Sequence, residues 1–406
     1  MSAFVHIIPQ LPPAIDGVGD YCWNLWKHWL EPELDWGFLV ARGAEDTRAM
    51  FPEAPVNTFG LNAASLTEAL ERGSCRTAVL HYVGYAYQPK GIPVWLPRAL
   101  RDWRYGAAAH KPSLLTGRRL VVMFHEMYAR SSPLRSPFWV APVARRIIRD
   151  LARISDTWVT SCERYFGQLS GEFGAQPNAG RIIPIPSNIP APFKIDWPPS
   201  RGKLRIVVFG LAKTRIWALE RHSKLLRALH QADLIEHVTL AGQEPLPEDE
   251  RMWRHLAARI GSNVEWRTRF NLLAEDISAE LVQHDVGLLA NEPDVLTKSG
   301  VFAALAAHGV VPIVSTPARE PLPERFRPSV LANDDDRNIE QLVQLLREPS
   351  ALNQRREHVR ALAARELGWP GIARSWSEVL RVNVPAAALQ TAEEHAAFGN
   401  RLEVPA

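Results

Sequence analysis

The fold is constrained above all by an alternation of short apolar runs with amphipathic stretches, which continues through most of the chain. The runs have the length of buried strands, and the stretches between them have the period of helices. In the first half we expect strands at 4–8, 36–41, 77–83, 120–124, 157–160 and 181–185, and helices at 18–30 and 142–154. Strands that alternate with helices predict a parallel sheet with helices on both faces.

A proline-rich segment, residues 186–203, separates this series from a second one of the same kind. The second series has expected strands at 204–209, 238–242, 263–266, 285–290 and 310–314, and helices at 216–231, 247–259, 274–284 and 300–307. The predicted fold class is α/β, with two doubly wound Rossmann-like domains facing each other across a cleft. We expect a first domain at 1–185, a hinge at 186–203, a second domain at 204–367, a final helix at 368–381 and a tail at 382–406.

Composition excludes several classes of protein. The 406 residues include 47 Lys and Arg against 44 Asp and Glu, which gives no basic excess for a nucleic-acid partner. Three cysteines lie far apart without a CxxC pair, so neither a zinc site nor a disulfide framework is indicated. We expect no signal peptide, no membrane span and a cytoplasmic location. A peripheral contact with the inner face of a membrane stays open because of three tryptophans in the first helix, although core packing is the favoured interpretation: Trp23, Trp26 and Trp29.

The loop after the first strand is the first candidate site. It leads through Asp16, Gly17, Gly19 and Asp20 into the expected helix. The glycines would let the backbone approach a bound group, and the free N–H groups of a helix N-terminus attract an anion. The motif is not the GxGxxG fingerprint, and a plain turn is an equally good interpretation.

His125 and Glu126 follow the expected strand 120–124. The carboxyl ends of parallel strands are where such sheets bind ligands. A histidine there can position a hydroxyl or polarise a phosphate, and a glutamate can act as a base. A histidine satisfied within a loop is the alternative.

The second domain has two segments suited to a diphosphate. Gly210 ends a strand, and Lys213 and Arg215 follow it. Further along, Lys298, Ser299 and Gly300 open a helix, where an ammonium, a hydroxyl and backbone N–H groups would converge. The upstream glycines of a Walker A loop are missing. Asp294 is a candidate for binding a sugar or ribose hydroxyl, and solvated helix starts are the alternative.

Taken in order, these motifs resemble the bacterial family-four-like glycosyltransferases of the GT-B fold. The resemblance rests on the PPAIDGVGDY loop at 12–21, His125-Glu126, VTS at 159–161, PIPSNI at 184–189, VFG at 208–210, KSGVFAA at 298–304 and the helix 369–376. Each motif is loose, and their order over residues 4–381 is the stronger argument.

The resemblance implies that the second domain binds a nucleotide-sugar donor and the first an acceptor, either a sugar, a lipid-linked molecule or a small molecule. Gly17 and Gly19 would lie against the donor phosphates, and His125 would contact the transferred sugar. The family commonly carries two glutamates with seven residues between them, but those places hold Leu296 and Ala304. This departure puts the donor and the stereochemistry in doubt.

The expected reaction is therefore sugar transfer without a metal or a cofactor. Lys213, Arg215, Lys298 and the helix at Gly300 would stabilise the leaving diphosphate. If the configuration inverts, a base must deprotonate the acceptor, and the candidates are Asp16, Asp20 and Glu126. A nucleotide-sugar epimerase and a non-catalytic GT-B partner subunit are the alternatives.

Overall fold

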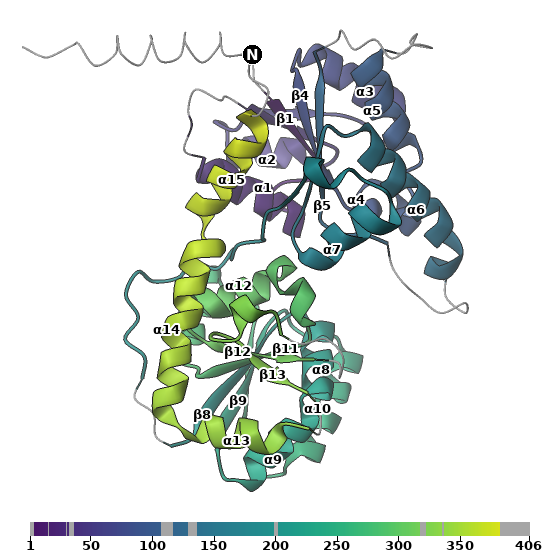
Figure 1. Cartoon of the computed structure of the whole chain (residues 1–406). Helices are drawn as coiled ribbons and strands as arrows, with labels where there is room; N and C mark the ends of the chain where they lie inside the picture. Colours follow the sequence, from purple (N-terminus) through teal and green to yellow (C-terminus); the bar gives the residue numbers. More distant parts are fainter. Residues whose placement is uncertain are drawn as a thin grey trace, which may run out of the picture. The chain divides into compact units, whose positions relative to one another are not determined.

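The computed structural model describes residues 4–14, 16–29, 31, 36–106, 117–128, 136–198, 202–316, 322–334 and 337–381. The expected tail, 382–406, and residues 199–201 of the expected hinge lie outside this part. The chain divides into two compact units. Unit 1 comprises Met1–Thr160, Tyr165–Ile183 and Trp369–Ala406, and unit 2 comprises Ser161–Arg164 and Pro184–Gly368. Each unit contains one parallel sheet with helices (Figure 1).

Unit 1 is built on a seven-stranded sheet in the order β3-β2-β1-β4-β5-β6-β7. Its strands are β1 (Phe4–Ile8), β2 (Trp36–Val40), β3 (Val56–Thr58), β4 (Thr77–Tyr82), β5 (Arg119–Phe124), β6 (Thr157–Thr160) and β7 (Gly180–Ile182). Its helices are α1 (Gly17–Lys27), α2 (Ala44–Met50), α3 (Ala63–Arg72), α4 (Gly84–Tyr87), α5 (Trp95–Tyr105), α6 (Ser136–Ile154) and α15 (Trp369–Arg381), and α7 (Glu163–Gly167) has residues of both units.

Burial explains why these segments are strands. Every residue of β2 and β5 is buried, as expected for central strands covered on both faces. One face of the sheet packs a core with α3, α5 and α6, which includes Leu100, Trp103 and Leu151. Helix α1 contacts both β1 and α15, so the last helix of the chain belongs to this unit.

Unit 2 is built on a six-stranded parallel sheet in the order β10-β9-β8-β11-β12-β13. Its strands are β8 (Leu204–Gly210), β9 (Ile235–Gly242), β10 (Trp266–Phe270), β11 (Val286–Leu289), β12 (Val311–Ser315) and β13 (Leu331–Asn333). Its helices are α8 (Ala212–Arg221), α9 (Ser223–Gln231), α10 (Pro247–Ile260), α11 (Ala274–Leu281), α12 (Gly300–Ala307), α13 (Ile339–Arg347) and α14 (Pro349–Glu366).

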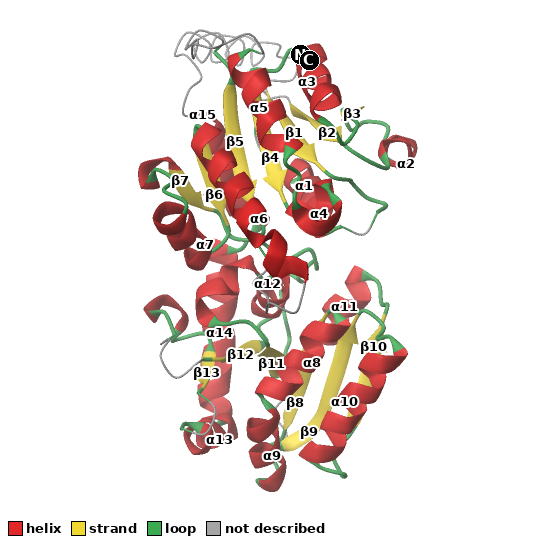
Figure 2. Cartoon of the chain, turned by 90° about the vertical axis from the view of Figure 1, so that its right-hand side faces the viewer, coloured by secondary structure: helices red, strands yellow, loops and turns green. Residues whose placement is uncertain are grey.

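Two separate apolar clusters show that helices cover both faces of this sheet. One joins side chains of α8, α9, α10 and α13 to the strands, and the other joins α11, α12 and α14 to them. Figure 2 shows α8 and α10 in front of β8 and β9. The predicted fold class, α/β with doubly wound parallel sheets, is therefore confirmed.

The strand order fixes where a ligand is expected in each unit. In unit 1 the chain moves outward from β1 to β3 and then returns to β4, so the order reverses between β1 and β4. In unit 2 it reverses between β8 and β11. At such a reversal the loops leave the sheet in opposite directions and open a crevice at the carboxyl ends of the strands.

Candidate functional site

The start of α1, beside the reversal point of unit 1, is organised by Asp16. Its carboxylate accepts a hydrogen bond of 3.0 Å from the backbone N–H of Gly19, so Asp16 is the N-cap of the helix. Burial raises the pKa of Asp16, against the lowering effect of the Gly19 and Val18 N–H groups and of Arg42. Asp16 was predicted from the sequence as a candidate base. The structure shows that it also caps α1, which the sequence did not indicate.

The two glycines of α1 have different surroundings. A Cβ on Gly19 would lie 2.4 Å from the carbonyl oxygen of Gln10, so only glycine lets the helix pack against its own loop. A Cβ on Gly17 would have no heavy atom within 4 Å. Gly17 is therefore the position of this pair where a bound group has room to approach the backbone.

Asp20 is the carboxylate of α1 that is suited to proton transfer. Burial, followed by the charge of Asp16, raises the pKa of Asp20 to about 6. A base whose pKa lies near the working pH combines availability with driving force. Glu126, the third candidate base, is exposed in the segment after β5.

His125 lies directly after β5, and the ring of Tyr21 from α1 meets it edge-on with centroids 5.4 Å apart. The Tyr21 hydroxyl in turn accepts a 2.6 Å hydrogen bond from the indole N–H of Trp376 on α15. His125 and the start of α1, predicted separately from two motifs, thus lie on adjoining elements of the same unit.

His125 is also the end of an array of three buried histidines. His125 Nε2 lies 2.8 Å from His81 Nδ1, and His81 Nε2 lies 2.7 Å from His6 Nδ1. His81 belongs to β4 and His6 to β1, the two strands at the reversal point. The sequence analysis missed both residues, although a histidine inside each apolar run was the available signal.

His6, His81 and Cys22 are the only group of metal-ligating side chains found within the described residues. The contact between His6 Nδ1 and His81 Nε2 does not fit two ligands of one metal ion. Two nitrogens bound to one tetrahedral zinc ion would lie about 3.3 Å apart, since each Zn–N bond is about 2.0–2.1 Å. The 2.7 Å between His6 and His81 is instead a hydrogen bond.

In unit 2, the carboxyl ends of β8 and β9 lie close to the start of α12. Gly210 has φ +125°, and a Cβ there would be 3.1 Å from a methyl group of Val301. A Cβ on Gly242 would be 2.3 Å from the Gly210 carbonyl oxygen. The structure therefore brings Gly210 together with the Lys298-Ser299-Gly300 segment, as expected for a site at the reversal of β8 and β11.

Ser299 is the N-cap of α12. Its hydroxyl accepts a 3.2 Å hydrogen bond from the backbone N–H of Phe302. Gly300 begins the helix, and a Cβ there would meet no heavy atom within 4 Å. The half-buried Lys298 ends the preceding 3-10 helix, Pro293–Lys298. Lys213 lies exposed on the first turn of α8, the helix that follows Gly210.

Arg215 has a different role from the one predicted. It is only 3 % exposed, and its guanidinium donates to the carbonyl oxygens of Gly210, Ala241 and Gln243. It also lies over the ring of Phe270, with 4.8 Å to the centroid. Burial lowers the pKa of Arg215 to about 10. Arg215 thus ties together the ends of β8 and β9 rather than presenting its charge at the surface.

Asp294 is held by an arginine that the sequence analysis missed. Arg164 donates to the Asp294 carboxylate through Nε at 2.7 Å and through Nη2, which it also shares with Glu292. Arg221 lies 3.8 Å from Glu292 on the other side. The two carboxylates that precede α12 in the sequence are therefore paired with arginines of their own unit.

The two positions that replace the family glutamates are part of the core. Leu296 is fully buried and Ala304 is 1 % exposed, and both pack in the cluster that contains Phe302. A glutamate at either place would put a charge among apolar side chains. The departure from the family pattern is therefore built into the packing of α12.

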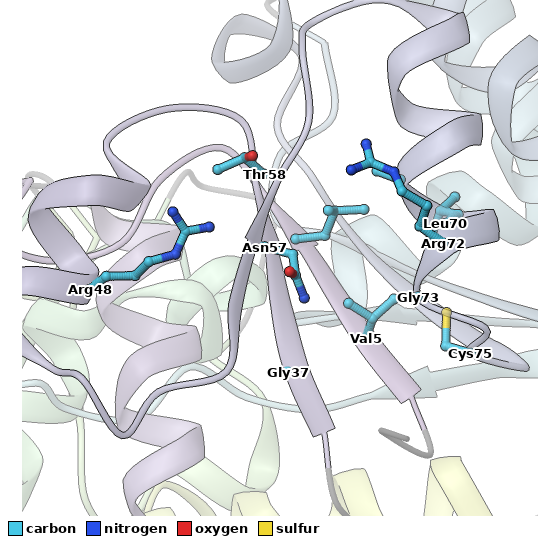
Figure 3. Close-up of a pocket in the computed structure, with 11 residues that line it drawn as sticks. Val5, Gly37, Arg48, Asn57, Thr58, Leu70, Arg72, Gly73 and Cys75 are labelled. Carbon is cyan, nitrogen blue, oxygen red and sulfur yellow. The ribbon is translucent and has the colours of Figure 1, made fainter.

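One cavity of unit 1, of about 380 Å³, lies apart from these residues. Arg48 and Arg72 flank it, with Asn57 and Val5 of the sheet beneath (Figure 3). None of the predicted site residues lines it. The cavity lies on the face of the sheet over β1, β2 and β3. The candidate site residues lie instead at the carboxyl ends of the strands.

Comparison with known proteins identifies the fold. No protein-family model matches the chain, and no curated protein matches it in sequence. Among solved structures, a sucrose-phosphate synthase from Thermosynechococcus elongatus matches with a TM-score of 0.64 and 14 % identity over 94 % of this chain and 98 % of its own. HepE of Anabaena, in complex with UDP-glucose, matches with a TM-score of 0.59 and 13 % identity over 93 % of this chain and 98 % of its own. The fold is GT-B.

The same fold serves more than one activity. A putative UDP-N-acetylglucosamine 2-epimerase from Listeria monocytogenes matches with a TM-score of 0.55 and 12 % identity, over 97 % of this chain and 98 % of its own. The predicted resemblance to GT-B glycosyltransferases is confirmed at the level of the fold.

The structure bears on the expectation that the chain has no membrane span. Across the described helices, none is both long and apolar enough to cross a bilayer. Trp23 is buried and stacks on the half-buried Trp26 with centroids 4.9 Å apart, so the core packing favoured from the sequence holds for Trp23, while Trp26 and Trp29 are half-buried.

Proposed function

We propose that this protein is a glycosyltransferase of the EC 2.4 class, with unit 2 binding a nucleotide-diphosphate sugar and unit 1 binding the acceptor. The carrying observation is the placement of Gly210 and the start of α12 at the reversal point of a GT-B donor-type sheet. The likeness to HepE, whose structure contains UDP-glucose, supports a nucleotide sugar as the donor. The acceptor is a sugar, a lipid-linked molecule or a small molecule.

In this proposal the diphosphate lies at the N-terminus of α12. Backbone N–H groups at Gly300 and Val301, the helix dipole and the ammonium of Lys298 all favour negative charge there. Transfer places growing charge on the leaving diphosphate, so these groups act most strongly in the transition state. Lys213 on α8 adds a second cation, and Arg215 contributes only by holding the strand ends.

The acceptor half is the start of α1 and the end of β5. Asp20 takes the acceptor proton if the configuration inverts, and no base is needed in that place if it is retained. His125 contacts a hydroxyl group of the bound sugar. Asp16 supports both by capping α1.

We further propose that transfer needs no metal and no cofactor. The carboxylates closest to the donor segment, Glu292 and Asp294, are already paired with Arg164. A divalent cation would have to displace that guanidinium, whereas Lys298 and α12 supply positive charge without it.

Thermal shift with nucleotides tests the donor half. UDP, GDP, ADP, CMP and dTDP, with their sugars, are added with and without EDTA, and binding to the folded state must raise the melting temperature. One series should stabilise the wild type equally in both conditions, and Lys298→Ala should abolish the shift. Lys203→Ala is the matched control because Lys203 lies at the other end of β8, paired with Asp233.

The outcomes separate the competing functions. Nucleotide release that depends on an added acceptor supports transfer. A rearranged nucleotide sugar without an acceptor would establish an epimerase instead. No shift with any nucleotide at millimolar concentration would favour a non-catalytic subunit, for which the buried Leu296 and Ala304 are the structural argument.

A further inference from the structure

Helices α5 and α6 of unit 1 carry a concentration of positive charge that the whole-chain composition hides. The two helices contain seven arginines against two aspartates, which leaves 40 Lys and Arg against 42 Asp and Glu in the rest of the chain. They contact each other and cover the same core of unit 1 (Figure 1). The net charge of +3 is thus the sum of one strongly basic region and a slightly acidic remainder.

The arginines of these helices follow the helical repeat, so they share one surface. On α5, Arg98 and Arg101 lie four and seven residues after Val94, and all three side chains are exposed. On α6, Arg146 is exposed and Arg149, three residues later, is half-buried. Side chains with these spacings lie on one face of a helix. Each helix therefore presents a row of guanidinium groups.

The aspartates of the two helices do not cancel this charge. Asp102 lies 3.7 Å from Arg98, and Asp150 lies 3.9 Å from Arg146, each pair four residues apart along its helix. The two arginine side chains are 80 % and 82 % exposed, so water screens both pairs and they hold the guanidinium groups weakly. The arginines remain available to an anionic partner.

An apolar groove of about 560 Å³ lies between the two helices. The buried Pro97 and Ile147 lie beneath it, and Val94 and Val143 line its sides with 58 % and 38 % of their surface exposed. Trp139, one turn before Val143 on α6, is 71 % exposed. Adjoining exposed apolar side chains with a polar rim are typical of an interaction surface. The face formed by α5 and α6 is therefore both basic and apolar.

The apolar residues lie at the end of both helices that is nearer the candidate site. A helix that connects two parallel strands begins at the carboxyl edge of the sheet and runs back towards the amino edge. Val94 directly precedes α5, and Trp139 is in the first turn of α6. His125 follows β5 at the same carboxyl edge. The apolar end of the groove is therefore on the side of unit 1 where His125 lies.

We propose that the face of unit 1 formed by α5 and α6 docks on an anionic lipid membrane. Trp139, Val94 and Val143 would enter the boundary between headgroups and acyl chains, while the arginines face the lipid phosphates. A nucleic acid or an acidic protein would use the same arginines but would leave exposed apolar side chains without a role, which favours the membrane. The tryptophans of α1 are not part of this surface.

Docking of this face also selects among the possible acceptors. It brings the carboxyl edge of unit 1 to the membrane, and the acceptor is therefore the lipid-linked molecule rather than a free sugar or a small molecule. This choice of acceptor rests on the proposed function, whereas the docking itself does not.

Co-sedimentation of the full-length protein with lipid vesicles tests the docking. Vesicles of phosphatidylcholine are compared with vesicles in which about one quarter of the lipid is phosphatidylglycerol, at about 50 mM and about 500 mM NaCl. We expect binding to the anionic vesicles at low salt, much weaker binding at high salt, and little binding to phosphatidylcholine alone. No binding to the anionic vesicles at low salt would overturn the proposal.

Two double variants separate the charges from the apolar side chains. Arg98→Gln with Arg146→Gln should weaken binding to the anionic vesicles about tenfold or more. Val94→Ser with Val143→Ser should weaken it by about the same factor with no change of charge. The four side chains are exposed, so the melting temperature should stay close to that of the wild type. Binding that is lost in the arginine variant but kept in the valine variant would replace the membrane by an acidic macromolecule.

Unit 2 offers matched controls for both variants. Arg251→Gln with Arg259→Gln removes the same charge from exposed positions of α10. Leu246→Ser with Leu273→Ser removes apolar side chains that are 58 % and 72 % exposed. Both controls should bind the anionic vesicles as the wild type does. An equal loss of binding in the controls would mean that no particular face docks, and the proposal would be wrong.

Transfer assays test the choice of acceptor. A sugar linked to a long-chain alkyl diphosphate is offered in the anionic vesicles, and the same sugar is offered free in solution. We expect transfer to the vesicle-bound sugar, with a loss of about tenfold in the valine variant that matches its weaker binding. Transfer to the free sugar alone would overturn the lipid-linked acceptor. If no donor is turned over with either sugar, the proposed function fails, while the vesicle measurements still decide the docking.

Discussion

Neighbouring residues of the same type acquire different tasks from their surroundings, and Asp16 and Asp20 show this within one turn of α1. Asp16 accepts the N–H of Gly19 and caps the helix. Asp20 is close enough to feel the charge of Asp16 and is partly buried, which raises its pKa to about 6. The sequence placed both among the candidate bases, because a carboxylate's hydrogen bonds and burial are not visible in its residue type.

We expect Asp20→Asn to lower activity and to raise stability at neutral pH. If the configuration inverts, loss of this general base lowers kcat by about 10²–10⁴-fold. Because the pKa of Asp20 is raised in the fold, ionisation opposes folding as the pH rises from the unfolded value of 3.8 to about 6. The melting temperature of the variant, compared with the wild type, should therefore rise between pH 4 and pH 7. Asp46→Asn, in the first turn of α2, is the control and should change neither quantity. Unchanged kcat in Asp20→Asn would remove Asp20 from the mechanism.

Asp285, just before β11, is the centre of a buried network of ion pairs in unit 2. Asp285 accepts hydrogen bonds from Arg205 at 2.7 and 2.9 Å and from Arg356 at 2.6 Å, with all three side chains mostly buried. Asp285→Ala leaves two buried guanidinium groups without their counter-charge, so we expect a loss of about 3–5 kcal/mol in urea unfolding. Arg254→Ala breaks an exposed pair on α10 and should change the free energy of unfolding by less than about 1 kcal/mol. Equal effects would mean that the network is not a buried one in solution.

At the scale of elements, the sequence predicted what its patterns encode and missed what packing decides. The apolar runs for β1, β4, β5, β8, β9, β11 and β12 gave those strands, because their residues are buried on both faces. The edge strand β3 was missed, since Asn57 and Thr58 are exposed there and carry no apolar pattern. The predicted helix 216–231 is two helices, α8 and α9, which meet at the buried His222.

The residues of the candidate site also fall into two groups, those with a local sequence signal and those without one. Turn glycines, helix starts and strand ends are local signals, and they located Gly210, Ser299 and His125 correctly within the fold. His6 and His81 act across the pairing of β1, β4 and β5, and Arg164 binds a carboxylate 130 positions away, and no local pattern encodes either contact. Only the strand order makes the three histidines neighbours.

Gly17 and Gly19 make a matched pair for testing the start of α1. Gly19→Ala places a Cβ 2.4 Å from the Gln10 carbonyl oxygen, so α1 must shift and we expect a loss of about 1–3 kcal/mol. Gly17→Ala has open space and should leave the melting temperature unchanged or slightly raised. If a ligand approaches the backbone at Gly17, Gly17→Ala should nevertheless weaken binding of the nucleotide sugar or acceptor in calorimetric titration. Full binding by Gly17→Ala would show that this turn serves folding alone.

At the scale of the whole molecule, both units have their candidate site residues at the same position in the sheet, the point where the strand order reverses. In each unit the first strand stands at the reversal point of the sheet. In unit 1 the helix after that strand begins with Gly17 and Gly19, and in unit 2 the strand itself ends in Gly210. Histidines then fill buried polar positions beneath this edge: His6 and His81 in unit 1, and His222 in unit 2, where its Nε2 lies 2.9 Å from the Leu289 carbonyl oxygen. The chain thus keeps neutral hydrogen-bonding rings where a charge would be costly.

These histidines should make the folded chain sensitive to mild acid. Burial lowers the pKa of six described histidines below the ordinary value of 6.5, to about 3 for His6, about 4 for His222 and His284, and in the same direction for His81, His237 and His308. The unfolded chain therefore binds protons below pH 6.5 that the folded chain does not. Their contribution to stability is complete above pH 6.5 and is lost as the pH falls towards 4 and 3.

Each such histidine lowers the free energy of unfolding by up to about 1.4 kcal/mol per pH unit in this range. Asp20 acts in the opposite direction but supplies only one proton. Urea midpoints at pH 7, 6 and 5 should therefore fall steeply and progressively. In His284→Gln one of the six groups is absent, so the stability of the variant should depend on pH less steeply by about that amount. A midpoint that stays constant from pH 7 to pH 5 would mean that these rings take up protons in the folded state.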